Sequence, residues 1–587
     1  MIGPNQQDTG DVVVLCWQAP VPSDRHVHKI AAFLGAQPTL VSLTADALRD
    51  EASIRQLVPT CSCLIVAAET LARAADDVGI KKVHSLINLA KHVLIYGFEP
   101  TDRHNAIVKD LSSGGLVRTH PTTDSDATFY VAKGYREWCG QFSGLSVRAT
   151  DVSRESAFLE SSDGRQSVMI RVGDEPFFVR VNSGGSQVFF LGSHEPADLD
   201  DKVERRTRPL AWFSNLVPFV MFLRGSLGNR LWHNDHPKAC FIIDDPRLTN
   251  RYGFLEYRRL LESMRRLRFS ACIAFIPWNY RRSSKEVAAL VSLNYDLPFL
   301  CVHGCDHTKE EFATTDVESL SGKARLSLER MRAHRHLSGV PFDDVMVFPQ
   351  GRFSAEAVTA LKASGYLASV NGAVCPSTRV PRLALRDVLD VAVTRFADFP
   401  LFGRRYPHDL AEFAFDLLMG KPAIAVEHHG YFRDGYGPLE TFVEGLNSLD
   451  ERLEWTNLAT ICSSACLTRE AKGGDVYIRF YTSRFRLKNS GTRTQRYVLL
   501  KRETETGARR SVTLGGRELE STHEGDKLKM CLSLDPGQVA DIEVRSEASD
   551  STDSSWMPTE VHNAKVWIRR LLCEFRDNHV DTARVLG

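Results

Sequence analysis

The stretch from about residue 238 to 467 constrains the fold most, because apolar β-rich runs alternate there with helical segments. These runs are "ACFIIDDP", "FSACIAFIPWN", "PFLCVHG", "DDVMVFPQG", "GYLASVNG", "LDVAVTRF" and "KPAIAVEHHGYF". Nearly continuous Val, Ile, Phe and Ala runs are typical of strands buried on both faces, as parallel strands covered by helices require. Ser354 can cap the helix "AEAVTALKAS", and Gly365 lies just past its end. The pattern predicts a parallel α/β barrel over residues 238–471.

The chain of 587 residues is too long for one core, since single cores stop growing at roughly 250–300 residues. Residues 1–200 alternate strands and helices and then turn to antiparallel patterns, which predicts an open α/β domain with a β-rich extension. We expect a helical connector over 201–237, an antiparallel β-sandwich over 472–546, and a polar linker with an amphipathic helix over 547–587. The first domain has no Gly-rich phosphate loop, so the sequence predicts no nucleotide site.

Charge and cysteine content bear on partners and compartment. Lys plus Arg and Asp plus Glu both number 73, so no net basic field favours nucleic acid. The thirteen cysteines form no small-domain framework and several lie in apolar runs, which fits a reducing cytoplasm. The N-terminus lacks a signal-peptide pattern and we find no run of about 18 apolar residues, so we expect no transmembrane segment. We therefore predict a cytoplasmic protein.

Polar side chains gather where the predicted strands end. They are Asp244 and Asp245 after the first strand, His303 and His307 after the third, Pro349 and Gln350 after the fourth, Asn371 after the fifth, and His428 and His429 after the seventh. In α/β barrels the carboxyl ends of the strands form the mouth that carries the reacting groups. We therefore expect one functional site at this mouth.

The residue types at the mouth suit a catalytic metal. A catalytic zinc ion takes about three protein ligands and keeps one position for water. His303 and His307 with one aspartate would meet that number. A second carboxylate could accept a proton from the water, and His428 or His429 could donate one to the leaving group.

The motifs "IIDDP", "HGCDH", "FPQGRF" and "VEHHG", in this order, resemble the metal-dependent polysaccharide deacetylases, carbohydrate esterases with a (β/α)7 barrel. The resemblance covers about 230 residues of the chain. It implies that Asp244 is the catalytic base and that Asp245, His303 and His307 bind a divalent metal, zinc or a similar ion. It implies that His428 or His429 is the general acid. The implied reaction is deacetylation of an N- or O-acetylated saccharide in polysaccharide metabolism.

The sequence departs from the family pattern at two places. Pro246 follows the aspartates where the family has Gly, and Val347 and Phe348 stand where the family has an Arg before the prolines. Arg352 is the candidate for that missing role. We also expect Arg352, Gln350, Trp278 and Asn371 to bind substrate, since they lie at the mouth. The indole of Trp278 could stack on a sugar ring.

Other interpretations remain open from the sequence. The aspartates could cap a turn, and the two histidines of the third strand end could form a polar turn. The barrel could be a non-catalytic glycan-binding or regulatory scaffold for polysaccharide production, or a glycoside hydrolase using two carboxylates. Protein partners could bind the N-terminal domain or the C-terminal helix. In that helix Ala564, Trp567, Leu571 and Phe575 are helically spaced, which predicts a face that docks on the body, a partner or a membrane surface.

Overall fold

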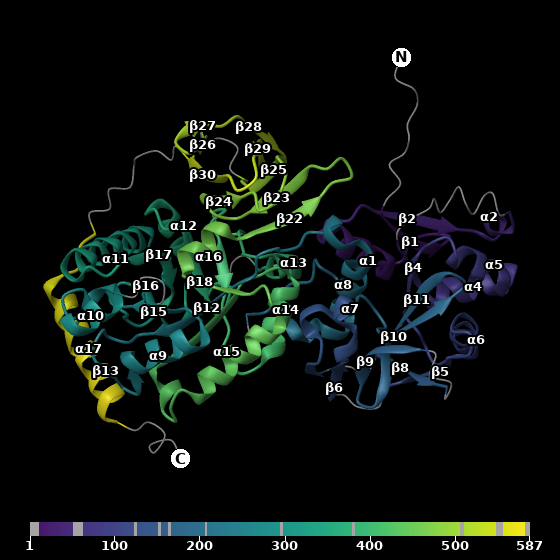
Figure 1. The fold of residues 1–587 in the computed structure, drawn as a ribbon, viewed down its shortest axis with the longest axis horizontal. Helices are drawn as coiled ribbons and strands as arrows, with labels where there is room; N and C mark the ends of the chain where they lie inside the picture. Colours follow the sequence, from purple (N-terminus) through teal and green to yellow (C-terminus); the bar gives the residue numbers. More distant parts are fainter. Residues whose placement is uncertain are drawn as a thin grey trace. The chain divides into compact units, whose positions relative to one another are not determined.

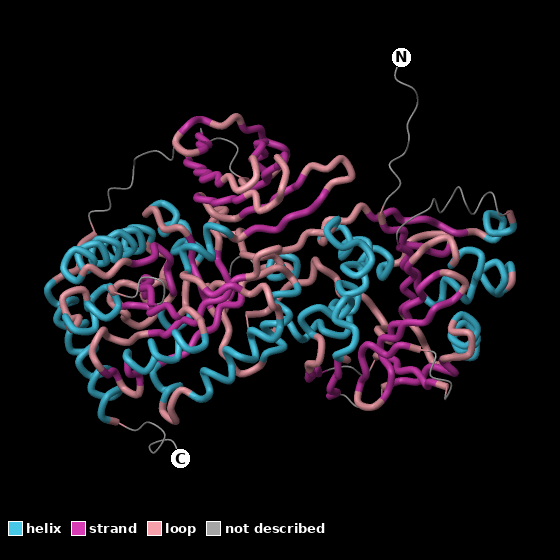
Figure 2. The backbone as a smooth tube through the Cα atoms, viewed as in Figure 1, coloured by secondary structure: helices cyan, strands magenta, loops and turns pink. Residues whose placement is uncertain are grey.

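The computed structural model describes residues 11–50, 63–122, 126–150, 154–161, 166–205, 208–293, 298–378, 382–504, 510–546 and 556–580. They form two compact units (Figures 1 and 2). Unit 1 comprises Met1–Asp201 and Thr207–His233, and unit 2 comprises Lys202–Arg206 and Asn234–Gly587. The predicted polar linker, at 547–555, lies outside the described residues.

Unit 1 is built on one mixed sheet of nine strands, in the order β2-β1-β3-β4-β11-β10-β9-β6-β7. The bounds are β1 Val12–Trp17, β2 Pro38–Leu43, β3 Cys63–Ala67, β4 His92–Tyr96, β6 Asp126–Val131, β7 Ser146–Thr150, β9 Ser167–Val172, β10 Glu175–Ser183 and β11 Ser186–Leu191. The first five strands in this order pair in parallel, and β11 to β7 pair antiparallel. The predicted α/β domain with a β-rich extension is confirmed, with both parts in one sheet.

Helices cover the parallel half of this sheet because their apolar stripes bury against it. They include α1 Pro22–Phe33, α4 Ala68–Val78, α5 Ile80–Ile87 and α6 Asp102–Leu111. The predicted connector contains α8, Phe213–Leu227, which belongs to unit 1. Within the described residues, Pro209–Arg230 is the one helical stretch long and apolar enough to cross a membrane, and 67% of its apolar window is buried in the protein. That burial is typical of a core helix.

Unit 2 contains a parallel sheet in the order β19-β18-β17-β16-β15-β12-β20, flanked by helices (Figure 2). The strands are β12 Lys238–Asp244, β15 Ala271–Phe275, β16 Pro298–His303, β17 Phe342–Val347, β18 Ala368–Asn371, β19 Leu401–Gly403 and β20 Ala423–His428. The helices are α9 Tyr257–Leu267, α10 Lys285–Ser292, α11 Val317–Ser338, α12 Ala355–Ala363, α13 Leu385–Leu389, α14 Leu410–Leu418 and α15 Gly437–Leu449. The predicted parallel α/β architecture is confirmed.

Two local features show how the sequence produces this architecture. Ser354 caps α12 as predicted, its hydroxyl accepting the N–H of Ala357 at 3.1 Å. The last and first strands of the sheet are joined by a single parallel bridge between Arg405 and Ala425, which curls the sheet toward a barrel. This bridge brings the residues after β19 next to β20 and β12.

The predicted sixth strand, "LDVAVTRF", is wrong. Its residues form only an isolated bridge, Val393 to Leu401, and the strand of the sheet is β19. Ala397 and Asp398 both have a φ of 52° and reverse the chain between the two segments. The apolar run is therefore one arm of a turn that leads into the strand.

After α16, Leu458–Ser464, two further sheets pack face to face, as the predicted sandwich requires. Their orders are β22-β23-β25-β29-β28 and β24-β30-β26-β27. The strands are β22 Cys466–Glu470, β23 Val476–Phe480, β24 Arg484–Lys488, β25 Gln495–Arg502, β26 Arg510–Leu514, β27 Arg517–Glu518, β28 Ser521–Glu524, β29 Lys527–Leu534 and β30 Val539–Ser546. All pairs are antiparallel except β23 with β25. Tyr481 donates to Asp390 at 2.5 Å, which ties the sandwich to the barrel.

Candidate metal and catalytic site

The loop after β16, which contains "HGCDH", is shaped by one buried carboxylate that the sequence analysis missed. Glu311 accepts the backbone N–H groups of Cys305, Asp306 and His307 at 2.9, 3.1 and 3.1 Å. Gly304 has a φ of 66°, and a Cβ there would lie 2.1 Å from the Glu311 Oε1 atom. Only glycine therefore fits this position. The signal in the sequence was an acid four residues after His307, in a loop with many backbone donors to satisfy.

Asp245, His303 and His307 converge at the ends of β12 and β16. Their ligand atoms all lie within 4.8 Å of one another. The Asp245 Oδ1 atom is 2.9 Å from His303 Nε2 and 3.0 Å from His307 Nε2. Asp245 and His307 have φ values of 75° and 56°, in the left-handed region that side chains rarely adopt. These two turns bring ligands from different strand ends to one point.

A hydrogen bond at His303 leaves its Nε2 atom available for a metal. The His303 Nδ1–H donates to the carbonyl of Val347 at 3.0 Å, which directs the Nε2 lone pair toward Asp245. Burial lowers the pKa of His303, but Asp244 and Asp245 outweigh burial and raise it. Burial raises the pKa of Asp245, while His307 and His303 hold it well below its usual value. An ionised carboxylate and two imidazoles therefore share one enclosed space.

These residues fit a small divalent ion. Two imidazoles and one carboxylate are the donor set of many catalytic zinc sites, whose tetrahedral ligands lie about 3.3 Å apart. The distances from Asp245 Oδ1 to the Nε2 atoms of His303 and His307, 2.9 and 3.0 Å, are only slightly shorter. Asp245 Oδ1 is also a buried atom that lacks a well-formed hydrogen bond within the described residues. A cation would satisfy that atom.

Asp244 is held by an arginine that the sequence analysis did not predict. Arg404, directly after β19, donates from Nη1 and Nη2 to the two carboxylate oxygens of Asp244, both at 2.8 Å. Both side chains are buried: Arg404 is 8% exposed and Asp244 is 2% exposed. Burial raises the pKa of Asp244, and Arg404 and His303 together bring it below its usual value. Asp244 is therefore an ionised carboxylate beside the candidate metal ligands.

The two candidate acids lie in different surroundings. His428 ends β20 and pairs in register with Asp244 of β12, so the two side chains share one face of the sheet. His428 also lowers the pKa of Asp244 electrostatically. The ring of His429 instead lies against Tyr252 and Phe254, and its Nε2 is 3.7 Å from Asp577. Of the two, His428 is the one that lies on the same face of the sheet as Asp244.

The predicted substrate residues make contacts of their own. Arg352 forms an ion pair with Glu310, away from Asp244, so it does not take the role of the family arginine. Gln350 accepts the N–H of Glu310 at 3.2 Å. The guanidinium of Arg330 lies 5.0 Å from the ring centre of Trp278. Asn371 is fully buried and donates to Gly351 and Ala373.

The C-terminal helix α17, Glu560–His579, lies on the same end of the barrel. His562 Nε2 is 2.8 Å from Asp306, and Arg569 Nε donates to the carbonyl of His307 at 3.3 Å. Asp306 also accepts from Arg330 at 2.5 Å. Residues more than 250 positions later in the chain thus contact the candidate metal loop.

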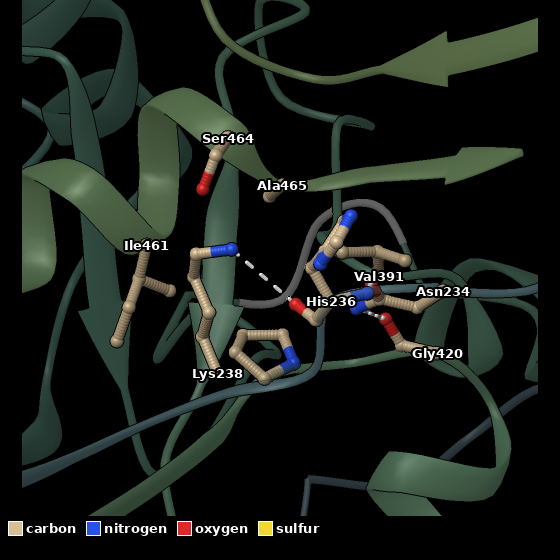
Figure 3. A pocket seen from close by; sticks show the side chains of 9 residues that line it. Asn234, His236, Lys238, Val391, Gly420, Ile461, Ser464 and Ala465 are labelled. Atoms are coloured by element: carbon tan, nitrogen blue, oxygen red, sulfur yellow. Dashed lines mark hydrogen bonds between the residues drawn. The ribbon is translucent and has the colours of Figure 1, made fainter. Parts of the chain in front are cut away.

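A separate pocket lies at the opposite end of β12 (Figure 3). Asn234, His236, Lys238, Val391, Gly420, Pro422, Ile461, Ser464 and Ala465 line it. Lys238 donates to the carbonyl of His236 at 3.3 Å, and Asn234 to that of Gly420 at 3.1 Å. Lys238 begins β12 whereas Asp244 ends it, so this pocket is not part of the candidate site.

No protein-family model and no curated protein matches the sequence. Among solved structures, the carbohydrate deacetylase Agd3 matches with a TM-score of 0.47 and 10% identity, over 91% of this chain and 98% of that one. The chain matches carbohydrate deacetylases in structure. A polysaccharide deacetylase homologue from Mycobacterium smegmatis matches with a TM-score of 0.26 and 15% identity, over 39% of this chain and 90% of that one. A CE4-family pseudoenzyme from Bacillus anthracis matches with a TM-score of 0.24 and 11% identity, over 38% and 71%.

Proposed function

We propose that this protein is a metal-dependent hydrolase that removes acetyl groups from an N- or O-acetylated saccharide. The observation that carries the proposal is the arrangement at the barrel mouth. A His-His-Asp cluster suited to a divalent ion lies directly beside a second aspartate, Asp244, which Arg404 keeps ionised. A histidine, His428, stands on the same face of the sheet as Asp244.

Each residue has a distinct role in this proposal. Asp245, His303 and His307 hold the ion, zinc in our proposal, which when bound acts as a Lewis acid and acidifies water. Asp244 accepts a proton from the attacking water, because it is ionised and engages no metal ligand nitrogen by hydrogen bond. Arg404 is a positioning residue that fixes both oxygens of Asp244. His428 donates a proton to the departing amine or hydroxyl.

The glycosidase alternative fits the paired aspartates less well. A glycoside hydrolase needs one of its two carboxyl groups protonated, with a raised pKa, to act as general acid. The pKa of Asp244 and that of Asp245 are both held below the usual value, by Arg404 and by the two histidines. Neither aspartate is therefore suited to donate a proton at neutral pH.

The test combines metal content with acetate release from N-acetylated amino-sugar oligosaccharides. We expect near-stoichiometric metal in wild type and in Asp244→Asn, but loss of metal in His303→Ala/His307→Ala. Acetate release should disappear in Asp244→Asn and in His303→Ala/His307→Ala. His336→Ala, an exposed histidine on α11, is the matched control and should change neither quantity.

Two results would contradict this proposal. Full metal content in His303→Ala/His307→Ala would remove the metal site. Metal binding without acetate release from any acetylated saccharide would favour the non-catalytic scaffold.

We also propose that the protein is cytoplasmic. The cysteines of the described residues are all free thiols, as in proteins of the reducing cytoplasm, and cell fractionation tests this location.

A further inference from the structure

Helix α17 is amphipathic, but its charged side is the one that docks on the barrel. Val566, Arg570 and Glu574 face inward and are only 1–8% exposed. Glu574 pairs with Arg247 at 2.7 Å and with Arg282 at 2.7 and 2.8 Å. The Nε and Nη2 atoms of Arg570 are buried with no hydrogen-bond partner in the described residues. Apart from Val566, the docked face is therefore charged, and Glu574 holds it to the barrel through ion pairs with two arginines.

Polar contacts continue along the same face to both ends of the helix. Near its start, His562 contacts Asp306 of the candidate metal loop. Near its end, Asp577 accepts from the Tyr252 hydroxyl at 2.8 Å, and the Asn578 side chain accepts the N–H of Gly253 at 2.9 Å. Figure 1 shows α17, in yellow, beside β13, Arg251–Tyr252, at the edge of the barrel.

The opposite face of α17 carries the large apolar side chains. Their exposed fractions lie between 45% for Leu571 and 65% for Val561. The members of this apolar face are Val561, Trp567, Ile568, Leu571, Leu572 and Phe575. At about 100° per residue they span an arc of about 140° on the helix. The sequence pattern therefore identified the apolar stripe correctly, but the stripe points away from the protein.

Basic residues line one margin of the apolar face. Lys565, Arg569 and Arg576 follow it on the helical wheel, at about 40–80° from Val561. Lys565 and Arg576 are exposed, and Arg569 is half-buried. Of the acidic residues of the helix, Glu574 and Asp577 face the barrel, and only Glu560, in the first turn, lies within the arc of the apolar face. An apolar arc with cations along its margin is the pattern of helices that lie in the surface of an anionic bilayer.

We propose that the apolar face of α17 binds an anionic membrane surface. The helix lies parallel to the bilayer plane, inserts Trp567, Leu571 and Phe575 among the acyl chains, and places Lys565 at the headgroups. A second copy of the chain is a poorer occupant. The face of a 30 Å helix offers about 300 Å² per copy, or ~600 Å² in total, below the ~1,200 Å² of a specific interface.

This proposal does not depend on the deacetylase activity, but it bears on the candidate site. The inner side of α17 contacts Asp306 and the backbone of His307. A membrane bound to the outer side therefore lies one helix diameter, about 10 Å, from the metal loop. Saccharides carried on lipids or held at the membrane would be presented near this mouth.

The test is co-sedimentation of the full-length protein with vesicles of phosphatidylcholine alone or with 30% phosphatidylserine. We expect binding to the anionic vesicles that weakens as salt is raised. Leu571→Ser/Leu572→Ser should weaken it at least about tenfold, since two leucines no longer enter the bilayer. The matched control is Leu293→Ser/Leu337→Ser, two leucines that are 82% and 63% exposed outside α17, which should bind as wild type does.

The outcomes separate the possible occupants. Absence of binding to either vesicle, or equal binding of wild type and Leu571→Ser/Leu572→Ser, overturns the proposal. Equal binding to neutral and anionic vesicles overturns the role given to Lys565, as does a Lys565→Gln variant that binds unchanged. Sedimentation velocity shows whether the protein dimerises. A wild-type dimer that is lost in Leu571→Ser/Leu572→Ser would overturn the membrane proposal and assign the apolar face to a second copy of the chain.

Discussion

Replacing Arg404 by methionine tests whether this residue supports the candidate base. The substitution keeps an unbranched side chain of similar length but removes the two hydrogen bonds to Asp244, each 2.8 Å long. It leaves a carboxylate that is 2% exposed without its cation. We expect a loss of both stability and activity.

The expected loss of stability follows from burial. Opposite charges about 4 Å apart at an effective dielectric constant of about 20 attract by ~4 kcal/mol. Breaking a buried pair by removing one partner typically costs ~3–5 kcal/mol. Because the folded pKa of Asp244 is depressed, its contribution is present above the unfolded pKa and is lost as pH falls through the folded pKa. The difference from wild type should thus be largest near pH 7 and shrink below about pH 4.

Urea unfolding followed by tryptophan fluorescence measures the loss, and Arg405→Met is the matched control. Arg405 is the next residue and forms an equally close ion pair with Asp416, which is 5% exposed, but it touches none of the candidate site residues. Both variants should lose comparable stability at pH 7. Only Arg404→Met should also reduce kcat for acetate release, by about tenfold or more, with its metal content retained.

The reasoning would be refuted if Arg404→Met and Arg405→Met reduced kcat alike, because the effect would then be general loosening of the barrel. It would also be refuted if Arg404→Met lost no stability at pH 7. Arg404→Lys, which supplies one point charge in place of a fork, should restore part of the stability. In the double variant Arg404→Met/Asp244→Asn, the stability cost should fall below the sum of the single costs.

Two further changes test the surroundings of the site, and a third tests a buried acid elsewhere in the barrel. Glu311→Gln should weaken metal affinity by about 10–100-fold, measured by competition with a zinc chelator, whereas Glu310→Gln should not, because only Glu311 holds the loop N–H groups. Gly304→Ala should lose metal binding and lower Tm, since its Cβ would collide with Glu311. Burial raises the pKa of Asp343 to about 7, so the folded state holds a proton that the unfolded state releases above about pH 4. Asp343→Asn should therefore be more stable than wild type at pH 8, by ~2–4 kcal/mol, with no gain at pH 4, as thermal unfolding at the two pH values would show.

The sequence predicted the parts of the fold that depend on periodicity. Buried parallel strands and the helices that cover them have long, regular patterns, so the barrel region, the mixed domain and the sandwich were all found. The sixth strand was missed because β19 has only three residues, shorter than any pattern can specify. The longer apolar run around Val393 has the stronger strand pattern, although it forms only an isolated bridge.

The candidate site was predictable only where it lies in consecutive motifs. Asp245, His303 and His307 lie at the ends of their strands or within four residues of them, so their convergence could be expected from topology alone. Arg404 could not be found in this way, because its approach to Asp244 depends on the bridge that curls the sheet through Arg405. Glu311 has no motif of its own, and its role is visible only from the loop it holds.

The late position of α17 in the chain affects the order in which parts of the candidate site form during synthesis. Chains fold from the N-terminus during synthesis, and His428 precedes the start of α17 by more than 130 residues. The strands that carry the metal ligands can therefore pair while the place of α17 on Asp306 is still vacant. In that interval the candidate ligands can come together while their loop is uncovered. If the site binds an ion as proposed, a newly made chain would take it up more readily than a finished one exchanges it.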